Sequence, residues 1–278
     1  MDCKFCGSIY TMKYGFKTGI QYYKCHNCNR KFAGRLAPEG MRFETATIGE
    51  AIGLFYGGLS LAGISRHLKT TDSIEVDPAT VWRWVVRYSK KADQVLNKIK
   101  IRASKRWVID EMTMRIGGQK VWLWDVIESE SRFILATNLG QTRTMRSAVD
   151  ILSEANKRTI GLPREILSDG IRTCPGTVEK VFGADSTHIR AKGLTAEINA
   201  NIIERFQGTA EERARVMRGL KTMESAKIIS EGFVMHYNFL RPHANLRGRT
   251  PAFVAGLELP FKTWKELVDY LWRISERS

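Results

Sequence analysis

The sequence lacks the features that mark membrane, secreted or disordered proteins. No stretch approaches the roughly 18 consecutive apolar residues of a membrane span, and Met1-Asp2-Cys3 does not begin the basic-then-apolar pattern of a signal peptide. Internal repeats and low-complexity segments are absent, while 43% hydrophobic and 26% charged residues are ordinary for a globular chain. We therefore expect a cytoplasmic protein whose 278 residues form about two domains, or one larger domain with small attachments.

The chain contains fewer acidic residues than basic ones. The chain has 44 Lys and Arg against 29 Asp and Glu, a net charge of +15. The excess is uneven, since residues 1–105 carry 18 basic and 8 acidic side chains, a balance of +10. A concentrated positive field attracts polyanions, and phosphate neutralisation with counterion release dominates affinity for nucleic acids. This asymmetry favours a nucleic-acid partner over a protein that is merely basic.

Cysteine is scarce as well, and four of the five cysteines lie within the first 28 residues. Cys3 and Cys6 form one C-x-x-C pair, Cys25 and Cys28 form a second, and 18 residues separate the pairs. In a cytosolic chain this spacing is typical of one structural, tetrahedral Zn²⁺ site, in preference to a redox dithiol or free core thiols. The residues between the pairs would fold back as a hairpin, which predicts a zinc ribbon over residues 1–35.

Residues 44–100 predict a helix-turn-helix domain. Apolar residues recur at helical spacing from Thr45, a short second helix begins at Ser60, and Asp77-Pro78 supplies the N-cap and first residue of a longer third helix. This layout is typical of a helix-turn-helix, although it also fits the solvated face of an ordinary three-helix bundle. The basic residues expected at double-stranded DNA are Arg30 and Lys31 of the ribbon and Arg83, Arg87, Lys90 and Lys91 of the third helix.

From residue 106 the pattern changes to mixed α/β. Three runs with strand character predict an antiparallel meander over 107–116, 119–127 and 132–137. The elements expected after it are a helix over about 142–157, a short strand ending at Ser168, a helix over 175–182, a strand over 187–191 and a long helical region from about 197 to beyond 228, interrupted around Gly219.

Three carboxylates in this region indicate metal-dependent chemistry. Asp110 lies in an apolar strand, where an unpaired carboxylate is costly. Asp169 follows a strand at a Ser-Asp-Gly turn, and Glu204 lies on the long helix. Carboxylates suit Mg²⁺ or Mn²⁺, and when they converge on two metals ~3.5–4 Å apart they help to activate an attacking oxygen and to stabilise a leaving one. Taken alone, each acid also fits a helix cap, a salt bridge or, for Asp169, a plain turn residue.

The residues around these acids resemble the DDE transposases and integrases of insertion sequences. The matching segments are Val108-Ile109-Asp110, Leu167-Ser168-Asp169-Gly170, Asn201-Ile202-Ile203-Glu204-Arg205-Phe206 and the tail Tyr237-Asn238-Phe239-Leu240-Arg241-Pro242-His243, with Leu246 and Thr250-Pro251 after it. The 34-residue gap between Asp169 and Glu204 is also habitual in that family. The resemblance covers about residues 3–255, and it includes relatives with an N-terminal zinc ribbon and helix-turn-helix.

The resemblance implies an RNase H-like mixed sheet with flanking helices over residues 105–255. After it, residues 256–278, which the resemblance does not cover, are expected to form a C-terminal helical extension. It also implies that Asp110, Asp169 and Glu204 form a catalytic triad that holds two Mg²⁺ or Mn²⁺. Further DNA contacts expected in this region are Arg213, Arg215, Arg241 and His243.

One position departs from the family pattern. Many relatives carry Lys or Arg two helical turns after the catalytic Glu, where it grips the transposon end, and this chain has Glu211. An acid there adds repulsion near metals and phosphates. Arg215, four residues on, is placed to pair with Glu211, which leaves Arg213 or Arg218 for the DNA role.

The resemblance implies a transposase that cleaves the ends of its element and joins them to target DNA. Two ends must be brought together, so we expect a homodimer or larger synaptic assembly, associated with the nucleoid and not with membranes. The alternative is a catalytically impaired, transposase-derived regulator that binds specific DNA, which Glu211 favours. A structure-selective RNase H-like nuclease ranks last, because it would need no helix-turn-helix.

Overall fold

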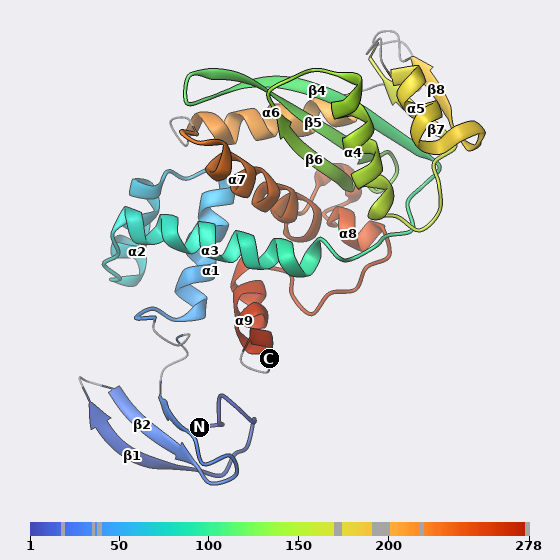
Figure 1. Ribbon diagram of the computed structural model, residues 1–278. Helices are drawn as coiled ribbons and strands as arrows, with labels where there is room; N and C mark the ends of the chain where they lie inside the picture. The colour runs from blue at the N-terminus through green and yellow to red at the C-terminus, as the bar shows by residue number, and fades with distance from the viewer. Residues whose placement is uncertain are drawn as a thin grey trace.

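The structure is a computed structural model that describes residues 1–17, 20–34, 37, 41–169, 174–190, 201–216 and 220–275. It consists of a small N-terminal sheet, a group of helices and a larger α/β unit (Figure 1). Gly170, Arg218 and the start of the helix predicted from about residue 197 lie outside the described residues, as does the side chain of Arg215.

The N-terminal sheet contains the hairpin predicted between the cysteine pairs. Its antiparallel strands follow in the order β1 (Thr11–Lys17), β2 (Ile20–Cys25) and β3 (Lys31–Ala33). The buried core of this sheet contains Cys3, Cys25 and Phe32, against which Phe5 and Tyr23 pack. So few apolar side chains bury little surface, which is why a unit of this size depends on a metal or a similar cross-link.

The helical group contains α1 (Thr45–Gly57), α2 (Leu61–Asp72), α3 (Pro78–Leu96) and α9 (Trp264–Ser275). The predicted cap is present, since Asp77 accepts from the Ala79 N–H ahead of α3, and the Ser60 hydroxyl accepts from the Gly63 N–H at the start of α2. The C-terminal helix α9 packs on α1 at close range, since a Cβ atom on Gly49 would lie 2.3 Å from the Lys265 Cα. A glycine at this position therefore permits the two helices to meet.

His236 lies where the helical group meets the α/β unit. The ring of Tyr56 on α1 stacks on Trp264 of α9, and the Trp264 Nε1–H donates to His236 Nδ1 at 3.2 Å. Burial, together with the positive charges of Arg241 and Arg213, lowers the pKa of His236 to about 3. The junction therefore holds a neutral imidazole.

We expect the neutral His236 to make this protein labile to acid. Its folded-state pKa lies below the ordinary 6.5, so its contribution to stability is complete above pH 6.5 and is lost as the pH falls toward 3. His236→Asn keeps an acceptor near the Nδ1 position but cannot titrate. Between pH 7 and pH 4, the free energy of unfolding should fall by about 2–3 kcal/mol less in this variant than in the wild type. Urea unfolding at both pH values measures this, and equal losses would contradict the assignment.

The α/β unit is built on one five-stranded mixed sheet. Its strands are β4 (Arg106–Ile116), β5 (Gln119–Glu128), β6 (Ile134–Gly140), β7 (Glu165–Ser168) and β8 (Thr187–Arg190). They lie in the order β6-β5-β4-β7-β8, with β4, β5 and β6 antiparallel and β7 and β8 parallel to β4. A meander followed by two parallel strands added at β4 is the RNase H-like arrangement, as the sequence predicts.

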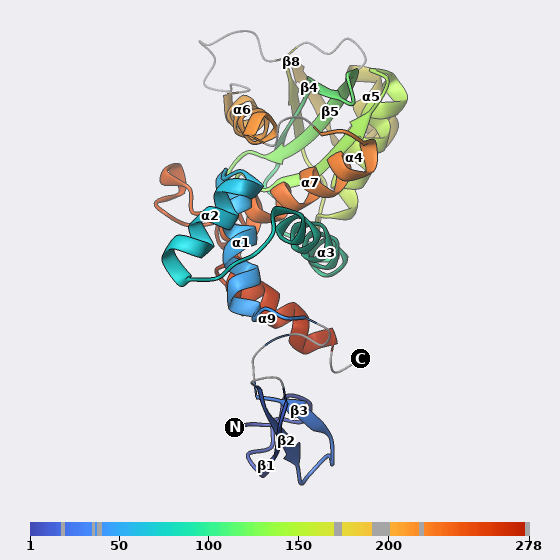
Figure 2. The same ribbon diagram turned by 90° about the vertical axis from the view of Figure 1, so that its left-hand side faces the viewer.

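Helices cover both faces of this sheet. They are α4 (Met145–Lys157), α5 (Cys174–Phe182), α6 (Asn201–Val216) and α7 (Met223–Met235), followed by the π-helical turn η2 (His236–Leu240) and the short helix α8 (Pro251–Val254). Seen from the side, α6 lies on one side of the sheet and α4 and α5 on the other (Figure 2). No helix in the described parts of the chain is long and apolar enough to cross a membrane.

Strand β6 differs from the sequence expectation at both ends, since it covers Ile134–Gly140 and not 132–137. Strand β6 begins at Ile134 and not at Arg132, because Arg132 adopts a positive φ of 62° in a turn whose backbone N–H groups are bound by Glu128. The interruption expected in the long helical region agrees with the structure, since α6 ends at Val216 and Thr222 caps α7 by accepting from the Ser225 N–H.

Candidate active site and metal centre

Strand register places three aspartates side by side across the sheet. Asp110 on β4 is paired with Asp125 on β5. On the other side of β4, Val108 is paired with Leu167 of β7, and the same offset brings Asp169 beside Asp110. Directly paired residues present their side chains on the same face of a sheet. We call Asp110, Asp125 and Asp169 the aspartate row.

The charge of Asp169 acts on Asp110, which agrees with the offset between β4 and β7. The Asp110 side chain is buried, whereas Asp169 is exposed at the end of β7. Burial, and then the charge of Asp169, raises the pKa of Asp110 to about 7. A buried carboxylate opposed by a neighbouring carboxylate is costly to ionise unless a cation lies between them. These oxygen donors therefore fit a hard divalent cation such as Mg²⁺ or Mn²⁺.

Helix α6 carries the third predicted ligand, Glu204, in its first turn. Glu204 is exposed, and α6 packs against β4 and β5. One turn further along, Gln207 Nε2 donates to Asp125 Oδ2 at 3.4 Å, and the Thr137 hydroxyl donates to Asp125 Oδ1 at 2.7 Å. The fully buried Asp125 thus fastens α6 to the face of the sheet that contains the aspartate row.

The three predicted ligands are not gathered as tightly as the cysteines. Among described residues, the only group of three or more Cys, His, Asp or Glu side chains close enough to hold one metal ion is Cys3, Cys6, Cys25 and Cys28, whose sulfur atoms all lie within 4.8 Å of one another. The oxygens of Asp110, Asp169 and Glu204 are therefore more widely spread.

Sequence reasoning did not identify Asp125 and Gln207, or the ion pair of Glu111 with Arg143. The Glu111 side chain is 4% exposed and binds Arg143 of the loop before α4. Asp125 had a detectable signal, because it interrupts the apolar run Trp122–Ile127 as Asp110 interrupts its own strand. A carboxylate inside an apolar strand is costly unless it is paired, so Asp125 could have been identified from the sequence by the same argument as Asp110.

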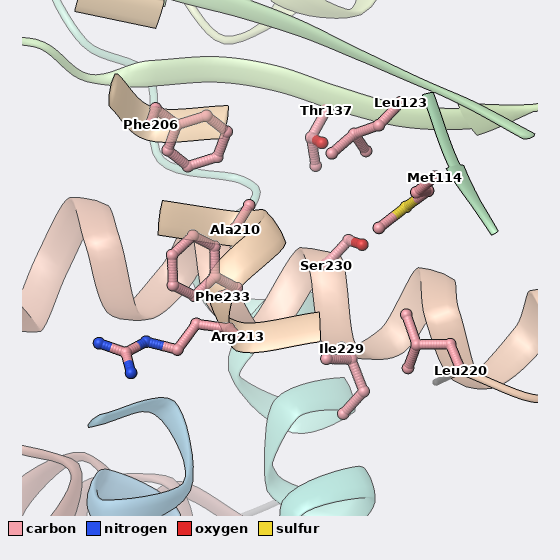
Figure 3. A pocket seen from close by; sticks show the side chains of 10 residues that line it. All are labelled: Met114, Leu123, Thr137, Phe206, Ala210, Arg213, Leu220, Ile229, Ser230 and Phe233. Carbon is pink, nitrogen blue, oxygen red and sulfur yellow. The ribbon is translucent and has the colours of Figure 1, made fainter. Parts of the chain in front are cut away.

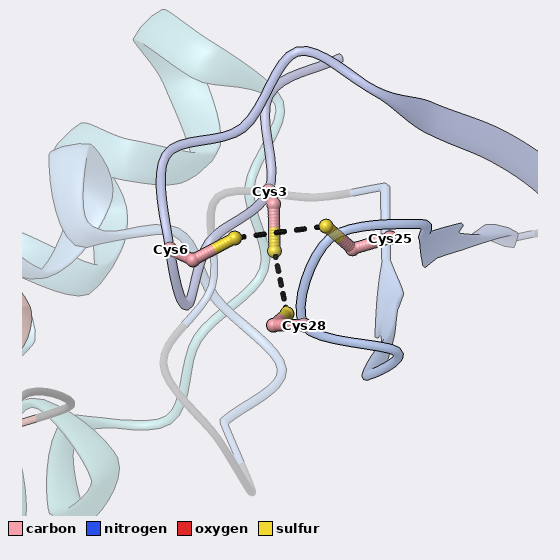
Figure 4. Close-up of side chains that lie close together, drawn as sticks. All are labelled: Cys3, Cys6, Cys25 and Cys28. Carbon is pink, nitrogen blue, oxygen red and sulfur yellow. Dashed lines mark hydrogen bonds between the residues drawn. The ribbon is translucent and has the colours of Figure 1, made fainter.

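The four cysteines form a site whose dimensions fit zinc. Cys3 Sγ lies 3.5 Å from Cys28 Sγ, and Cys6 Sγ lies 3.6 Å from Cys25 Sγ (Figure 4). Tetrahedral Zn–S bonds of ≈ 2.3 Å separate two sulfurs by about 3.8 Å. Backbone N–H groups, foremost that of Cys28, lower the pKa of the Cys25 thiol and favour the thiolate that a metal requires.

Most of the basic residues predicted to bind DNA are accessible. Arg30, Lys31, Arg83, Arg87 and Lys90 are exposed, whereas Lys91, Arg213, Arg241 and His243 are half-buried. Lys90 forms an ion pair with Glu224 of α7 at 3.2 Å, and His243 Nε2 lies 3.1 Å from the Tyr237 carbonyl oxygen. Arg83 and Arg87 on α3 are therefore better placed than Lys90 for a contact with DNA.

Arg213 points into the molecule. It lines a small cavity of about 30 Å³ between α6, α7 and the sheet, with Phe206 and Phe233 beside it (Figure 3). Its guanidinium lies against the end of α1, where a Cβ on Gly58 would be 1.7 Å from Nη1. In this position Arg213 packs α6 against the helical group.

Comparison with known proteins agrees with this arrangement. The family model DDE_Tnp_IS240, described as a DDE domain, matches residues 104–243. The site therefore lies in a DDE domain. The chain belongs to the DDE-type transposases of insertion sequences.

Relatives are found in archaea and bacteria. An uncharacterized protein of Methanocaldococcus jannaschii is 24% identical over 192 residues, which span 68% of this chain and 83% of that protein. The transposase of insertion sequence IS257 in transposon Tn4003 of Staphylococcus aureus is 28% identical over 51% of this chain. The transposase of IS431mec from the same species is 29% identical over 45%. The matches span 63% and 55% of these two transposases.

Solved structures of retroviral integrases are also similar. The HTLV-2 integrase catalytic core domain has a TM-score of 0.43 and 14% identity, covering 56% of this chain and 99% of that chain. A chain of the simian T-cell lymphotropic virus intasome has a TM-score of 0.43 and 10% identity, covering 77% of each chain.

Proposed function

We propose that this protein is a transposase that catalyses metal-dependent DNA cleavage and strand transfer at the ends of an insertion sequence. The observation that carries the proposal is the buried Asp110, whose pKa the charge of Asp169 raises, on the sheet face that α6 covers with Glu204 in its first turn. Family membership supplies the reaction class, and the electrostatics of Asp110 support a cation site at the predicted positions.

Each part of the site has a distinct role in this proposal. Asp110, Asp169 and Glu204 hold two Mg²⁺ or Mn²⁺, which when bound neutralise charge on the scissile phosphate and activate the attacking oxygen. Asp125 accepts the Gln207 amide, and this bond sets the position of α6 and therefore of Glu204. The attacking group is water in cleavage and a 3′-hydroxyl in strand transfer.

The N-terminal part recognises the element ends in this proposal. Residues 1–35 form a ribbon on one structural Zn²⁺ held by the four cysteines, and α1–α3 within residues 44–100 act as a helix-turn-helix. The catalytic unit over 105–255 contacts mainly the backbone of double-stranded DNA. A homodimer or larger assembly brings two ends together at the nucleoid in the cytoplasm.

Arg87→Gln is expected to weaken binding to the element end about tenfold, since it removes an exposed positive charge from α3. Lys90→Gln is the matched control on the same helix. It should weaken binding less than threefold, because Glu224 already neutralises Lys90. Fluorescence anisotropy with labelled end DNA measures both. Unchanged binding by Arg87→Gln would argue against α3 as the recognition helix, whereas a tenfold loss in both variants would show that Lys90 contacts DNA as well.

A joining assay tests the proposed reaction. Protein that retains zinc is mixed with labelled DNA from the flanks of its gene and a target plasmid, with Mg²⁺ or Mn²⁺. Joined products that need the divalent ion are expected. Tight binding to the flanks without cutting would instead support the DNA-binding regulator, for which Glu211 is the motivating residue, and Glu211→Lys would then be the variant to assay.

A further inference from the structure

Asn245, in the tail that follows α7, connects two arginines from distant parts of the chain. It lies in the short turn η3 (Ala244–Leu246). In the amide orientation that satisfies its neighbours, Asn245 Oδ1 accepts from Arg132 Nη1 at 2.8 Å and from Arg205 Nη1 at 3.1 Å. Arg132 belongs to the turn before β6, and Arg205 to the first turns of α6. One neutral oxygen thus holds two guanidiniums.

The two guanidiniums have no anionic partner in the described parts of the chain. Neither Arg132 nor Arg205 forms an ion pair there. The turn of Arg132 contains two carboxylates. Glu128 accepts from the backbone N–H groups of residues 130 and 131, and the exposed Glu130 forms no ion pair with either arginine in the described parts of the chain. An amide oxygen supplies a hydrogen bond but no compensating charge, so the repulsion between the two cations persists.

A third arginine adds to the positive charge at this place. Arg241 acts electrostatically on Tyr237 and His243, and Arg132 acts on the same two residues. The nearby His243, which stacks edge-on against Tyr237 at 4.3 Å and whose Nε2 contacts the Tyr237 carbonyl, adds no negative charge because an imidazole is either neutral or cationic. The tail motif therefore assembles a cluster of cations around η3.

The cluster is open to solvent beside the predicted catalytic residues. Arg205 and Asn245 are exposed, Arg132 is half-buried, and Arg205 directly follows Glu204 on α6. The planar fork of a guanidinium matches the oxygens of a phosphate, and two forks together can bind one phosphate group from both sides.

We propose that Arg132 and Arg205, held together by Asn245, form a binding site for one backbone phosphate of DNA. This site rests on the proposed function, and it places DNA along α6 next to Glu204. It also assigns a role to the tail motif, whose turn η3 presents Asn245 to the two arginines. A phosphate on the pair compensates both charges at once, which no group of the described chain does.

The dependence of DNA affinity on salt tests the site without requiring catalysis. Binding of a labelled duplex from the flanks of the gene is measured without divalent ions over a range of salt concentrations. Each phosphate contact contributes ≈ 0.9 to the slope of log affinity against log salt. Since both arginines bind the same phosphate, the double change Arg132→Gln and Arg205→Gln should lower the slope by about 0.9 and not by twice that amount. Arg146→Gln on α4, an exposed arginine on the other side of the sheet, should leave it unchanged.

The variant Asn245→Asp distinguishes a DNA-binding role of this cluster from a purely structural one. A carboxylate at this position would pair with both arginines, which should maintain or raise the melting temperature while it weakens DNA binding about tenfold. A structural role alone predicts no loss of binding in this variant.

A duplex with single neutral methylphosphonate linkages locates the contacted phosphate. One position should weaken binding by the wild type and have no effect on the double variant. A wild-type slope in the double variant would overturn the phosphate site alone, whereas failure of the wild-type protein to bind DNA would overturn the proposed function as well.

Discussion

Asp110→Asn and Asp169→Asn are each expected to reduce strand joining by at least about 10³-fold, equivalent to ~4 kcal/mol of activation free energy. Asparagine keeps the size of the side chain but removes the negative charge that would hold a divalent cation. The register that pairs Val108 with Leu167 brings the two carboxylates together, so neither has a substitute at the same place. Joined product per unit time is the measurement.

The same variants should bind the element end within twofold of the wild type, because neither aspartate belongs to the ribbon or to α3. Asp150→Asn is the matched control, since Asp150 is exposed on α4 on the other side of the sheet. Retained joining in Asp169→Asn would contradict the metal assignment. Loss of both joining and end binding would instead indicate a misfolded variant.

Cation binding gives a readout that does not depend on turnover. A ligand that binds only the folded state at 100 times its Kd adds ≈ 2.7 kcal/mol of stability. Mn²⁺ should therefore raise the melting temperature of the wild type and of Asp150→Asn, and raise it less in Asp110→Asn. An equal shift in all three proteins would place the cation elsewhere.

Much of this site follows from local sequence signals. The apolar strand around Asp110 and the turn after Ser168 each place one carboxylate, and family resemblance joins them to Glu204. The pairing of Asp110 with Asp125 depends on the register of two strands, which the hairpin between Ile116 and Gln119 sets. The register depends on where the chain turns, and only the folded sheet shows that the two carboxylates are neighbours.

The bonds made by Gln207 and Asn245 were not predictable in the same way. Gln207 reaches Asp125 across the interface between α6 and the sheet, and Asn245 reaches Arg132 and Arg205 on two other elements. Such contacts join segments far apart in sequence, and no periodicity or spacing rule encodes them. For Arg213, the positive charge alone predicted a DNA contact. The folded structure adds that its guanidinium lies against Gly58 at the end of α1.

Cys25→Ser, or removal of zinc with a chelator, is expected to unfold the N-terminal sheet and abolish selective binding to the element end. Among the residues that the structure describes, the buried core of this sheet is Cys3, Cys25 and Phe32, and β1 is almost entirely exposed. Structural zinc contributes ≈ 10–16 kcal/mol in small domains of this kind. A core of three side chains offers nothing comparable once the metal is lost.

The remainder of the molecule should stay folded, because its core extends over α1–α3, the five-stranded sheet and α9. Hydrogen exchange should therefore become fast in 11–33 and stay slow in β4 and β5. All seven tryptophans lie at position 82 or beyond, so their fluorescence reports the larger core. Cys174→Ser is the matched control, since buried Cys174 lies outside the cluster and the variant should retain one zinc per chain. Slow exchange in 11–33 of zinc-free Cys25→Ser would show that the sheet folds without its metal.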